Sequence, residues 1–202
     1  IHERLVGSEM CIRDRVGAGP GDPELLTLKA VKAIASATVL LVDDLVNDAV
    51  LEHASPSARI VHVGKRGGCK STPQAFIDKL MITAVQEGEH VVRLKGGDPF
   101  IFGRGGEEVE HLRAAGIDVE VVNGITSGLA GMSSLGAPLT HREHAHGVVF
   151  VTGHAKPGDS GTDWAQLAGT ARQAKLTLVI YMGVNSLAHI CQGLLSGLPA
   201  HT

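Results

Sequence analysis

The chain is short of the residues on which several kinds of binding surface depend. Only 3% of its 202 residues are aromatic, and its formal net charge is −3 at pH 7. Single-stranded nucleic acid binds to aromatic platforms, and nucleic acids and anionic membranes attract excess positive charge, so we expect neither partner. No apolar run approaches the roughly 18 to 20 residues that cross a bilayer, so we expect no membrane span.

Cysteine is scarce as well. The three cysteines, Cys11, Cys69 and Cys191, are odd in number and far apart in the sequence. They therefore form neither a disulfide framework nor the closely spaced pairs of a structural zinc site. This usage is typical of a reducing compartment, and we predict a cytoplasmic protein.

Glycine, in contrast, is abundant, and many of the 26 glycines lie in two loops, 17–23 and 96–106. Glycine lets the backbone approach a ligand closely. The second loop follows an apolar strand, and open α/β sheets bind ligands outside the carboxyl ends of their strands. The loops predict a small-molecule enzyme, with a tight strand-to-helix turn as the alternative for the first. That loop matches the dinucleotide fingerprint only weakly, and the sequence contains no P-loop motif.

Helical and strand patterns alternate from Pro23 onward. Strands are predicted at 38–42, 59–63, 90–94 and 119–122, and helices at 22–34, 49–53, 72–88 and 107–115. Such alternation is typical of a parallel sheet with helices on both faces. We predict an N-terminal α/β domain over 16–123.

The remainder, 124–202, has a weaker pattern. A helix of small residues is predicted at 127–135, then strands at 148–151 and 176–181 and a helix at 186–195. Two strands are too few for an independent layered core. We therefore predict a C-terminal α/β domain that is incomplete because the chain is truncated.

The first fifteen residues do not fit the domain that follows. A strand that enters the first glycine loop should be apolar, because parallel strands are covered on both faces. Here Arg13, Asp14 and Arg15 precede Val16. Nor is there the apolar centre of a signal peptide. We predict that 1–15 is a non-native leader that stands in place of the family's first strand, with a native polar tail as the alternative.

Seven segments resemble, in sequence and in order, the tetrapyrrole methylases, a family of enzymes that use S-adenosylmethionine. The segments are 17–29, 43–46, 64–66, 92–108, 124–127, 138–142 and 151–154. The resemblance implies a two-domain α/β enzyme, usually a homodimer, that holds S-adenosylmethionine between its domains and releases S-adenosylhomocysteine. The implied fold is not the Rossmann-type methyltransferase fold.

Among members of this family, the segments are most similar to those that C-methylate uroporphyrinogen III to precorrin-2, a step toward sirohaem and cobalamin. The resemblance therefore implies uroporphyrinogen III as the substrate. Two alternatives stay open: a later precorrin methyltransferase, and a fragment that binds the cofactor without turnover.

The resemblance also implies which residues contact the cofactor: Pro20, Gly96, Gly97, Asp98, Ile101, Thr126, Ser127 and Met182. Asp98 is expected to accept hydrogen bonds from the ribose or to balance the sulfonium. The glycines and Ile101 are expected to shape a close-fitting slot, and Met182 to act as a soft apolar filler. Ordinary core packing is an equal alternative for Met182.

Asp43 and Lys65 match the proton acceptor and proton donor of the family. Both follow predicted strands, at the edge where catalytic groups of such sheets lie. A carboxylate base and a lysine acid suit proton transfer when their surroundings tune their pKa values. The alternatives are a helix cap or solvated turn for Asp43, and simple attraction of the substrate for Lys65.

Four residues are expected at the polycarboxylate substrate: Arg66, Arg104, His141 and Arg142. Arginine forks suit carboxylates well. The group His141, His144 and His146 invites a metal interpretation, but its spacing fits no strong ligand pattern and methyl transfer needs no metal, so we predict no metal site.

The chain departs from the family pattern in several places. Val42 stands where the family commonly has Tyr, and Asn123 stands where Pro is usual. The first strand does not match, and the C-terminal strands of the family, with a late glycine at the adenosine, do not occur in this sequence.

Overall fold

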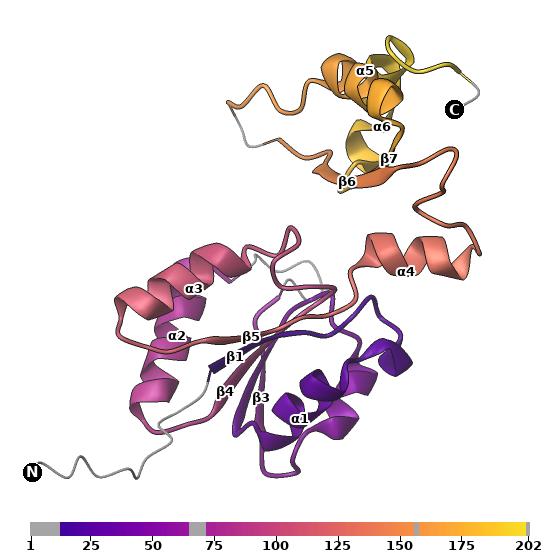
Figure 1. Ribbon diagram of the computed structural model, residues 1–202. Coiled ribbons are helices and arrows are strands. Elements are labelled where there is room, and N and C mark those ends of the chain that lie inside the picture. Colours follow the sequence, from indigo (N-terminus) through magenta and orange to yellow (C-terminus); the bar gives the residue numbers. More distant parts are fainter. Residues whose placement is uncertain (1–12, 65–71, 156–157, 201–202) are drawn as a thin grey trace, which may run out of the picture. The chain divides into compact units, whose positions relative to one another are not determined.

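The computed structural model describes residues 13–64, 72–155 and 158–200 (Figure 1). The chain divides into two compact units, Ile1–Ser127 and Gly128–Thr202. This division falls four residues beyond the domain boundary that the sequence suggests.

A five-stranded parallel sheet forms the centre of the N-terminal unit. Its strands are β1 (Arg13–Gly17), β2 (Val39–Val42), β3 (Arg59–His62), β4 (Val91–Lys95) and β5 (Glu120–Val122). They lie in the order β3-β2-β4-β1-β5, and every neighbouring pair is parallel. The prediction of a parallel sheet with helices on both faces is confirmed.

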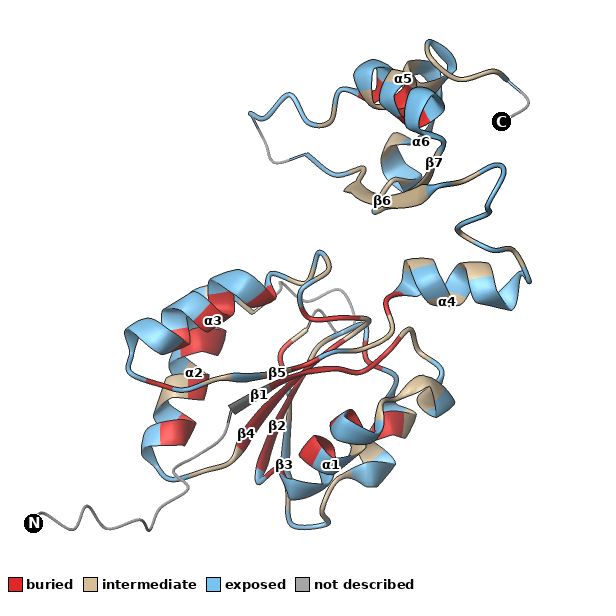
Figure 2. Cartoon of the chain, in the orientation of Figure 1, coloured by how far each residue is buried: buried red, intermediate tan, exposed pale blue. Residues whose placement is uncertain are grey.

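Different helices cover the two faces of this sheet (Figure 1). Helix α1 (Leu28–Ser36) packs against Val16, Leu40 and Leu94, and all three are fully buried. Helices α2 (Gln74–Gln86) and α3 (Gly105–Ala114) cover the other face. Because successive strand residues point to opposite faces, the central strands are buried along both (Figure 2).

Residues 13–15, which the sequence analysis assigned to the leader because of their charges, form part of the first strand. Strand β1 begins at Arg13 and pairs with both β4 and β5. Arg15 is 1% exposed and forms an ion pair with Glu108 of α3, which is 0% exposed. The sequence argument failed because a buried cation is tolerated when another element supplies its anion. Residues 1–12 of the predicted leader lie outside the described residues.

The single helix predicted over 22–34 is also wrong, because the segment is broken into two pieces. A 3-10 turn, η1 (Pro23–Leu25), comes first, and Asp22 caps it by accepting a hydrogen bond from the Glu24 amide at 2.9 Å. Thr27 then caps α1 by accepting from the Ala30 amide at 3.1 Å. These two N-caps lie five residues apart, and each starts its own helical segment. The short helix predicted at 49–53 is the 3-10 helix η2 (Asp48–His53).

The C-terminal unit contains one parallel strand pair, β6 (Gly147–Thr152) and β7 (Leu176–Tyr181). Helix α4 (Ser127–Ser134) precedes this pair, α5 (Trp164–Ala174) connects its strands, and η4 (Val184–Ser186) and α6 (Leu187–Leu195) follow. The sequence did not predict α5, because small alanines form most of its buried side. Every residue of β6 and β7 is only half-buried (Figure 2). Among the described residues, no helix is long and apolar enough to cross a membrane.

Candidate functional site

Three loops meet at the carboxyl edge of the N-terminal sheet. The loops after β1 and β4 are joined by a backbone bridge, in which Gly97 N donates to Gly19 O at 2.6 Å and Gly19 N donates to Gly97 O at 3.2 Å. Both residues have positive φ angles, +72° at Gly19 and +68° at Gly97. Side chains other than glycine rarely adopt that conformation, so these two glycines are required by the loops themselves.

The loop after β5 is held equally closely. A Cβ atom on Gly124 would lie 2.1 Å from Gly97 O, and one on Gly17 would lie 2.5 Å from Gly124 N. No side chain fits at these separations. The glycines therefore allow three backbones to pack directly against one another beyond the strand ends.

Asp98 joins two of these loops through its buried carboxylate. Oδ1 accepts from Phe100 N at 2.8 Å, and Oδ2 accepts from Gly124 N and from Asn123 Nδ2, both at 3.2 Å. The sequence predicted Asp98 as a cofactor contact, whereas the observed hydrogen bonds give it a role in holding the loops. Asn123, one of the departures from the family pattern, supplies one of those bonds, which proline has no donor to make.

The other residues predicted at the cofactor are spread over both units. Pro20, Gly96, Ile101, Thr126 and Ser127 belong to the N-terminal unit, and Thr126 is buried whereas Ser127 is exposed. A Cβ on Gly97 would meet only Thr126 within 4 Å, its nearest atom being Cα at 3.7 Å. A Cβ atom at Gly97 would therefore make only ordinary contacts, and the φ angle is what excludes other residues there.

Strained backbone occurs in the regions predicted to bind the cofactor. Phe102 and Arg104 have φ angles of 51° and 55°, and Met182 in the C-terminal unit has a φ of 56°. Non-glycine residues in this conformation are uncommon and concentrate at functional sites. Met182 is 56% exposed, so the core-packing alternative for this residue is wrong.

Asp43 lies just past β2, where the sequence placed it. Its amide donates to Leu94 O at 3.1 Å, and the register that pairs Val42 with Leu94 brings Asp43 beside Lys95. Its carboxylate lies 3.6 Å from Arg93 Nη2 and 3.9 Å from Lys95 Nζ. Asp43 is therefore an ion-paired group at the sheet edge, and the interpretation as a merely solvated turn is wrong.

Lys65 and Arg66 lie outside the described residues. The chain is described as far as Gly64, where a Cβ atom would lie 2.4 Å from Asp44 N. The backbone that leads into Lys65 therefore packs against the turn that carries Asp43.

The sequence analysis missed Arg93 and Lys95. Lys95 Nζ also lies 3.7 Å from Glu108 Oε1, so the lysine stands between two carboxylates. Burial lowers the pKa of Lys95 to about 8 and also lowers the pKa of Arg93. A signal was present, because two cations interrupt a strand that is otherwise apolar and covered on both faces.

The residues predicted at the substrate differ in their surroundings. Arg104 is 61% exposed and its Nη2 donates to Glu107 Oε2 at 2.6 Å, a hydrogen bond that raises the pKa of the guanidinium. His141 and Arg142 are exposed and belong to the C-terminal unit.

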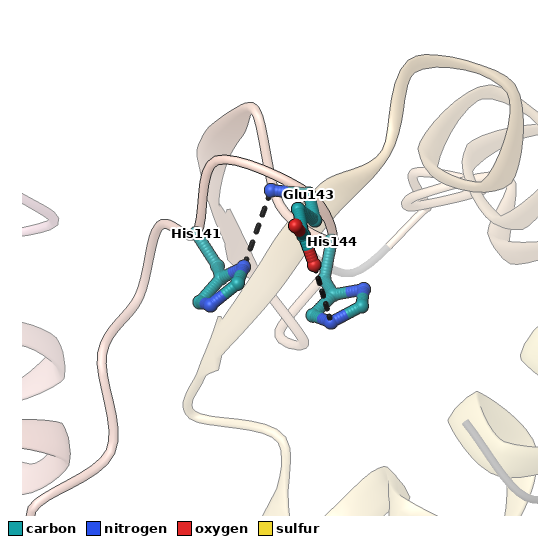
Figure 3. Close-up of side chains that lie close together, drawn as sticks. All are labelled: His141, Glu143 and His144. Carbon is teal, nitrogen blue, oxygen red and sulfur yellow. Dashed lines mark hydrogen bonds and ion pairs between the residues drawn. The ribbon is translucent and has the colours of Figure 1, made fainter.

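His141 lies in a tight turn with Glu143 and His144 (Figure 3). One ligand-type atom from each residue lies within 4.8 Å of the others, and all three side chains are exposed. His141 Nδ1 already accepts from Glu143 N at 3.2 Å, and the two imidazole rings stack at 4.6 Å. The cluster in the structure therefore differs from the three histidines that the sequence singled out, because it contains Glu143 and does not contain His146.

The fold and the glycine loops at the carboxyl edge of the sheet are those expected of a two-domain α/β enzyme that binds a small molecule. Residues 15–202 match the family model of the Tetrapyrrole (Corrin/Porphyrin) Methylases. The chain belongs to this family, as its motifs predicted.

Individual relatives show where the chain stands within the family. It is 60% identical over 182 residues to the uroporphyrinogen-III C-methyltransferase of Pseudomonas aeruginosa, and the match covers 90% of this chain and 72% of that protein. Siroheme synthase 2 of Aeromonas hydrophila is 50% identical over 90% of this chain and 38% of its own length.

Solved structures have the same fold. The uroporphyrin-III C-methyl transferase of Thermus thermophilus, complexed with S-adenosyl homocysteine, is 43% identical with a TM-score of 0.73 over 92% of this chain and 71% of its own. A cobalt precorrin-4 methyltransferase is 26% identical with a TM-score of 0.81 over 96% of this chain and 79% of its own.

Proposed function

We propose that this chain is a C-methyltransferase that transfers methyl groups from S-adenosylmethionine to uroporphyrinogen III and forms precorrin-2. The observation that carries the proposal is the 60% identity to a uroporphyrinogen-III C-methyltransferase over 90% of the chain. The relative of known structure that is complexed with S-adenosyl homocysteine supports the cofactor. The product would feed sirohaem or cobalamin synthesis, and the likeness to siroheme synthases favours the first.

The glycine loops suit a cofactor that lies against bare backbone. When bound, S-adenosylmethionine supplies an electrophilic methyl group. Pro20, Gly96 and Gly97 provide backbone at the carboxyl edge of the sheet. Asp98 acts on this site by fixing the loop conformation through its three hydrogen bonds. Ile101, Thr126, Ser127 and Met182 complete the set of cofactor contacts in the proposal.

Asp43 is the proton acceptor in this proposal, and Lys65 is the donor. The side chain of Asp43 is 28% exposed, so it reaches the surface where a macrocycle can approach. Arg93 and Lys95 lie beside this carboxylate, and a carboxylate can act as a general base. Arg66, Arg104, His141 and Arg142 are proposed to attract the carboxylates of the substrate.

The proposal also includes a homodimer in the cytoplasm. The family resemblance supports the homodimer, and the sparse, unpaired cysteines support a reducing compartment.

A later precorrin methyltransferase is the second candidate. The likeness to a cobalt precorrin-4 methyltransferase favours it, although the identity of 26% is less than half that to the Pseudomonas aeruginosa enzyme.

Anaerobic incubation with S-adenosylmethionine and freshly made uroporphyrinogen III tests the proposal. We expect a fluorescent product that carries two additional methyl groups by mass. Turnover only with substrates that are already methylated would favour the second candidate. Cofactor binding by calorimetry without any methylation would identify a protein that binds the cofactor but does not catalyse the reaction.

A further inference from the structure

Three buried cations lie on the face of the sheet that α2 and α3 cover. Arg15 is on β1 and Arg93 and Lys95 are on β4, and the parallel register pairs Arg15 with Arg93. Their side chains are only 1%, 4% and 8% exposed. The opposing charges come from other elements: Asp43 follows β2, and Glu108 is on α3. We call these five residues the charge cluster.

Of the two carboxylates in the charge cluster, Asp43 is the one that is accessible to solvent. Its side chain is 28% exposed, whereas that of Glu108 is 0% exposed. Each oxygen of Asp43 faces a different cation, Oδ1 facing Arg93 and Oδ2 facing Lys95. The backbone holds the guanidinium of Arg93 in place, because its Nη1 donates to Leu41 O of β2 at 3.2 Å and to Leu94 O of β4 at 3.1 Å.

We infer that Lys95 is a positioning residue for Asp43: with Arg93 it holds the Asp43 carboxylate oriented at the sheet edge, where it can accept a proton. This inference rests on the proposed function, because it assigns the proton transfer to Asp43. Lys95 itself touches neither substrate nor cofactor in this account. Its charge acts through the carboxylate 3.9 Å away.

Stability alone does not account for the charge cluster. Replacing a buried group of ions by apolar residues of similar size is often neutral or stabilising. The Nε atoms of Arg15 and Arg93 are buried and find no hydrogen-bond partner among the described residues. A purely apolar β4 would avoid these costs, so the ions indicate a function that needs charge at this edge.

The charge of Lys95 is also sensitive to pH. The pKa of its ammonium is lowered to about 8, first by burial and then by Arg93, with further contributions from Arg15 and Arg104, whereas Asp43 opposes the shift. The charged groups that face it are therefore Arg93 on its own strand, Arg15 on β1, Asp43 after β2, Glu108 on α3 and Arg104 immediately before α3. Above about pH 8 Asp43 loses one of its two cations, so turnover should fall there.

Three variants separate positioning from simple destabilisation. Lys95→Met removes the charge and keeps the bulk, Lys95→Arg keeps a charge that does not titrate, and Glu108→Gln disturbs the same cluster without touching Asp43. Each is compared with wild type by the pH profile of kcat and by the 13C NMR titration of the Asp43 carboxyl carbon. The NMR titration reads the contact between Lys95 and Asp43 without any turnover.

In Lys95→Met we expect kcat to fall about tenfold or more, with little change in KM. The acid limb of the profile and the NMR titration of Asp43 should both move to higher pH than in wild type, because a neighbouring cation is lost. Lys95→Arg should restore the acid limb and lose the alkaline limb near pH 8. Glu108→Gln should move neither limb upward, although it weakens the fold.

An Asp43 titration that is the same in Lys95→Met and wild type overturns the inference. A shift of equal size and direction in Glu108→Gln also overturns it, because the effect would then be general disruption. If wild type shows no methylation at all, the proposed function fails, and the NMR titration still decides whether Lys95 controls Asp43.

Discussion

The two faces of the N-terminal sheet use the same strands for different purposes. On the α1 face, Val16, Leu40 and Leu94 are fully buried in an apolar cluster. On the α2 and α3 face, the buried positions of β4 begin with Val91 and end with Arg93 and Lys95. The difference shows how a parallel sheet combines a stabilising core with a functional edge. In the central strands β2 and β4 apolar residues fill the α1 face, and on the other face ions occur only toward the carboxyl end of β4, where ligands bind in such sheets.

The largest effect on stability should come from breaking the charge cluster. Glu108→Gln leaves Arg15 and Lys95 without their shared anion in the interior, and removing one partner of such a group costs about 3–5 kcal/mol. Urea unfolding measures the loss. The neighbouring Glu107→Gln is the matched control, because Glu107 is 49% exposed and such surface pairs contribute at most about 1 kcal/mol. Equal losses in the two variants would contradict the distinction between buried and surface ions.

The apolar face should respond in stability alone. Leu40→Ala removes a fully buried side chain and should cost about 3 kcal/mol in the free energy of unfolding. The pH profile of kcat should keep both limbs where they are in wild type. Leu28→Ala, at a position that is 82% exposed, should change stability by less than about 0.5 kcal/mol. A displaced pH profile in Leu40→Ala would show that the two faces are not separate in function.

The third prediction uses the pH dependence of stability. The pKa of Lys95 is about 8 in the folded chain against an ordinary value of 10.5. Between these values the unfolded chain binds a proton that the folded chain does not, so stability rises with pH. The stability of wild type relative to Lys95→Met should therefore increase by on the order of 2–3 kcal/mol from pH 8 to 10.5. Denaturant titrations at several pH values measure it, and a flat or falling difference would contradict the burial of a charged lysine.

The smallest effect concerns the loops. Asn123→Ala removes one of the three hydrogen bonds to the Asp98 carboxylate and should cost about 1 kcal/mol. Cofactor affinity by calorimetry should fall only slightly, because Phe100 N and Gly124 N still hold the carboxylate. A complete loss of cofactor binding in Asn123→Ala would show that Asn123 contacts the ligand itself.

Most of the fold followed from sequence patterns, because helix and strand periodicities are local. The parallel sheet, helices α2 and α3 and the placement of Asp43 at a strand end were predicted correctly. Strand β1 was not, because the partner that makes Arg15 acceptable lies 93 positions further on in α3. No local pattern reveals such a pairing.

The sequence predicted that the glycine loops are important, but it did not predict that the loop conformation itself requires glycine. Gly97 was expected to admit a cofactor, yet its φ of +68° and its bridge to Gly19 mean that the loop itself requires glycine. A Gly97 variant therefore does not distinguish ligand binding from folding. Asp98 presents the same difficulty, because an asparagine would set an amide donor against the donors of Asn123 and Gly124. These roles depend on contacts between distant loops, which the sequence does not specify.

The central claim is that Asp43, held by Arg93 and Lys95, serves the chemical step and not the binding of the cofactor. The most direct test is a side-by-side measurement of S-adenosylmethionine affinity and of turnover in wild type and Asp43→Ala. We predict an affinity nearly equal to that of wild type and a turnover lower by about 10²-fold or more, as expected for the loss of acid–base assistance. Equal losses of affinity and turnover would contradict the claim and make Asp43 a structural residue.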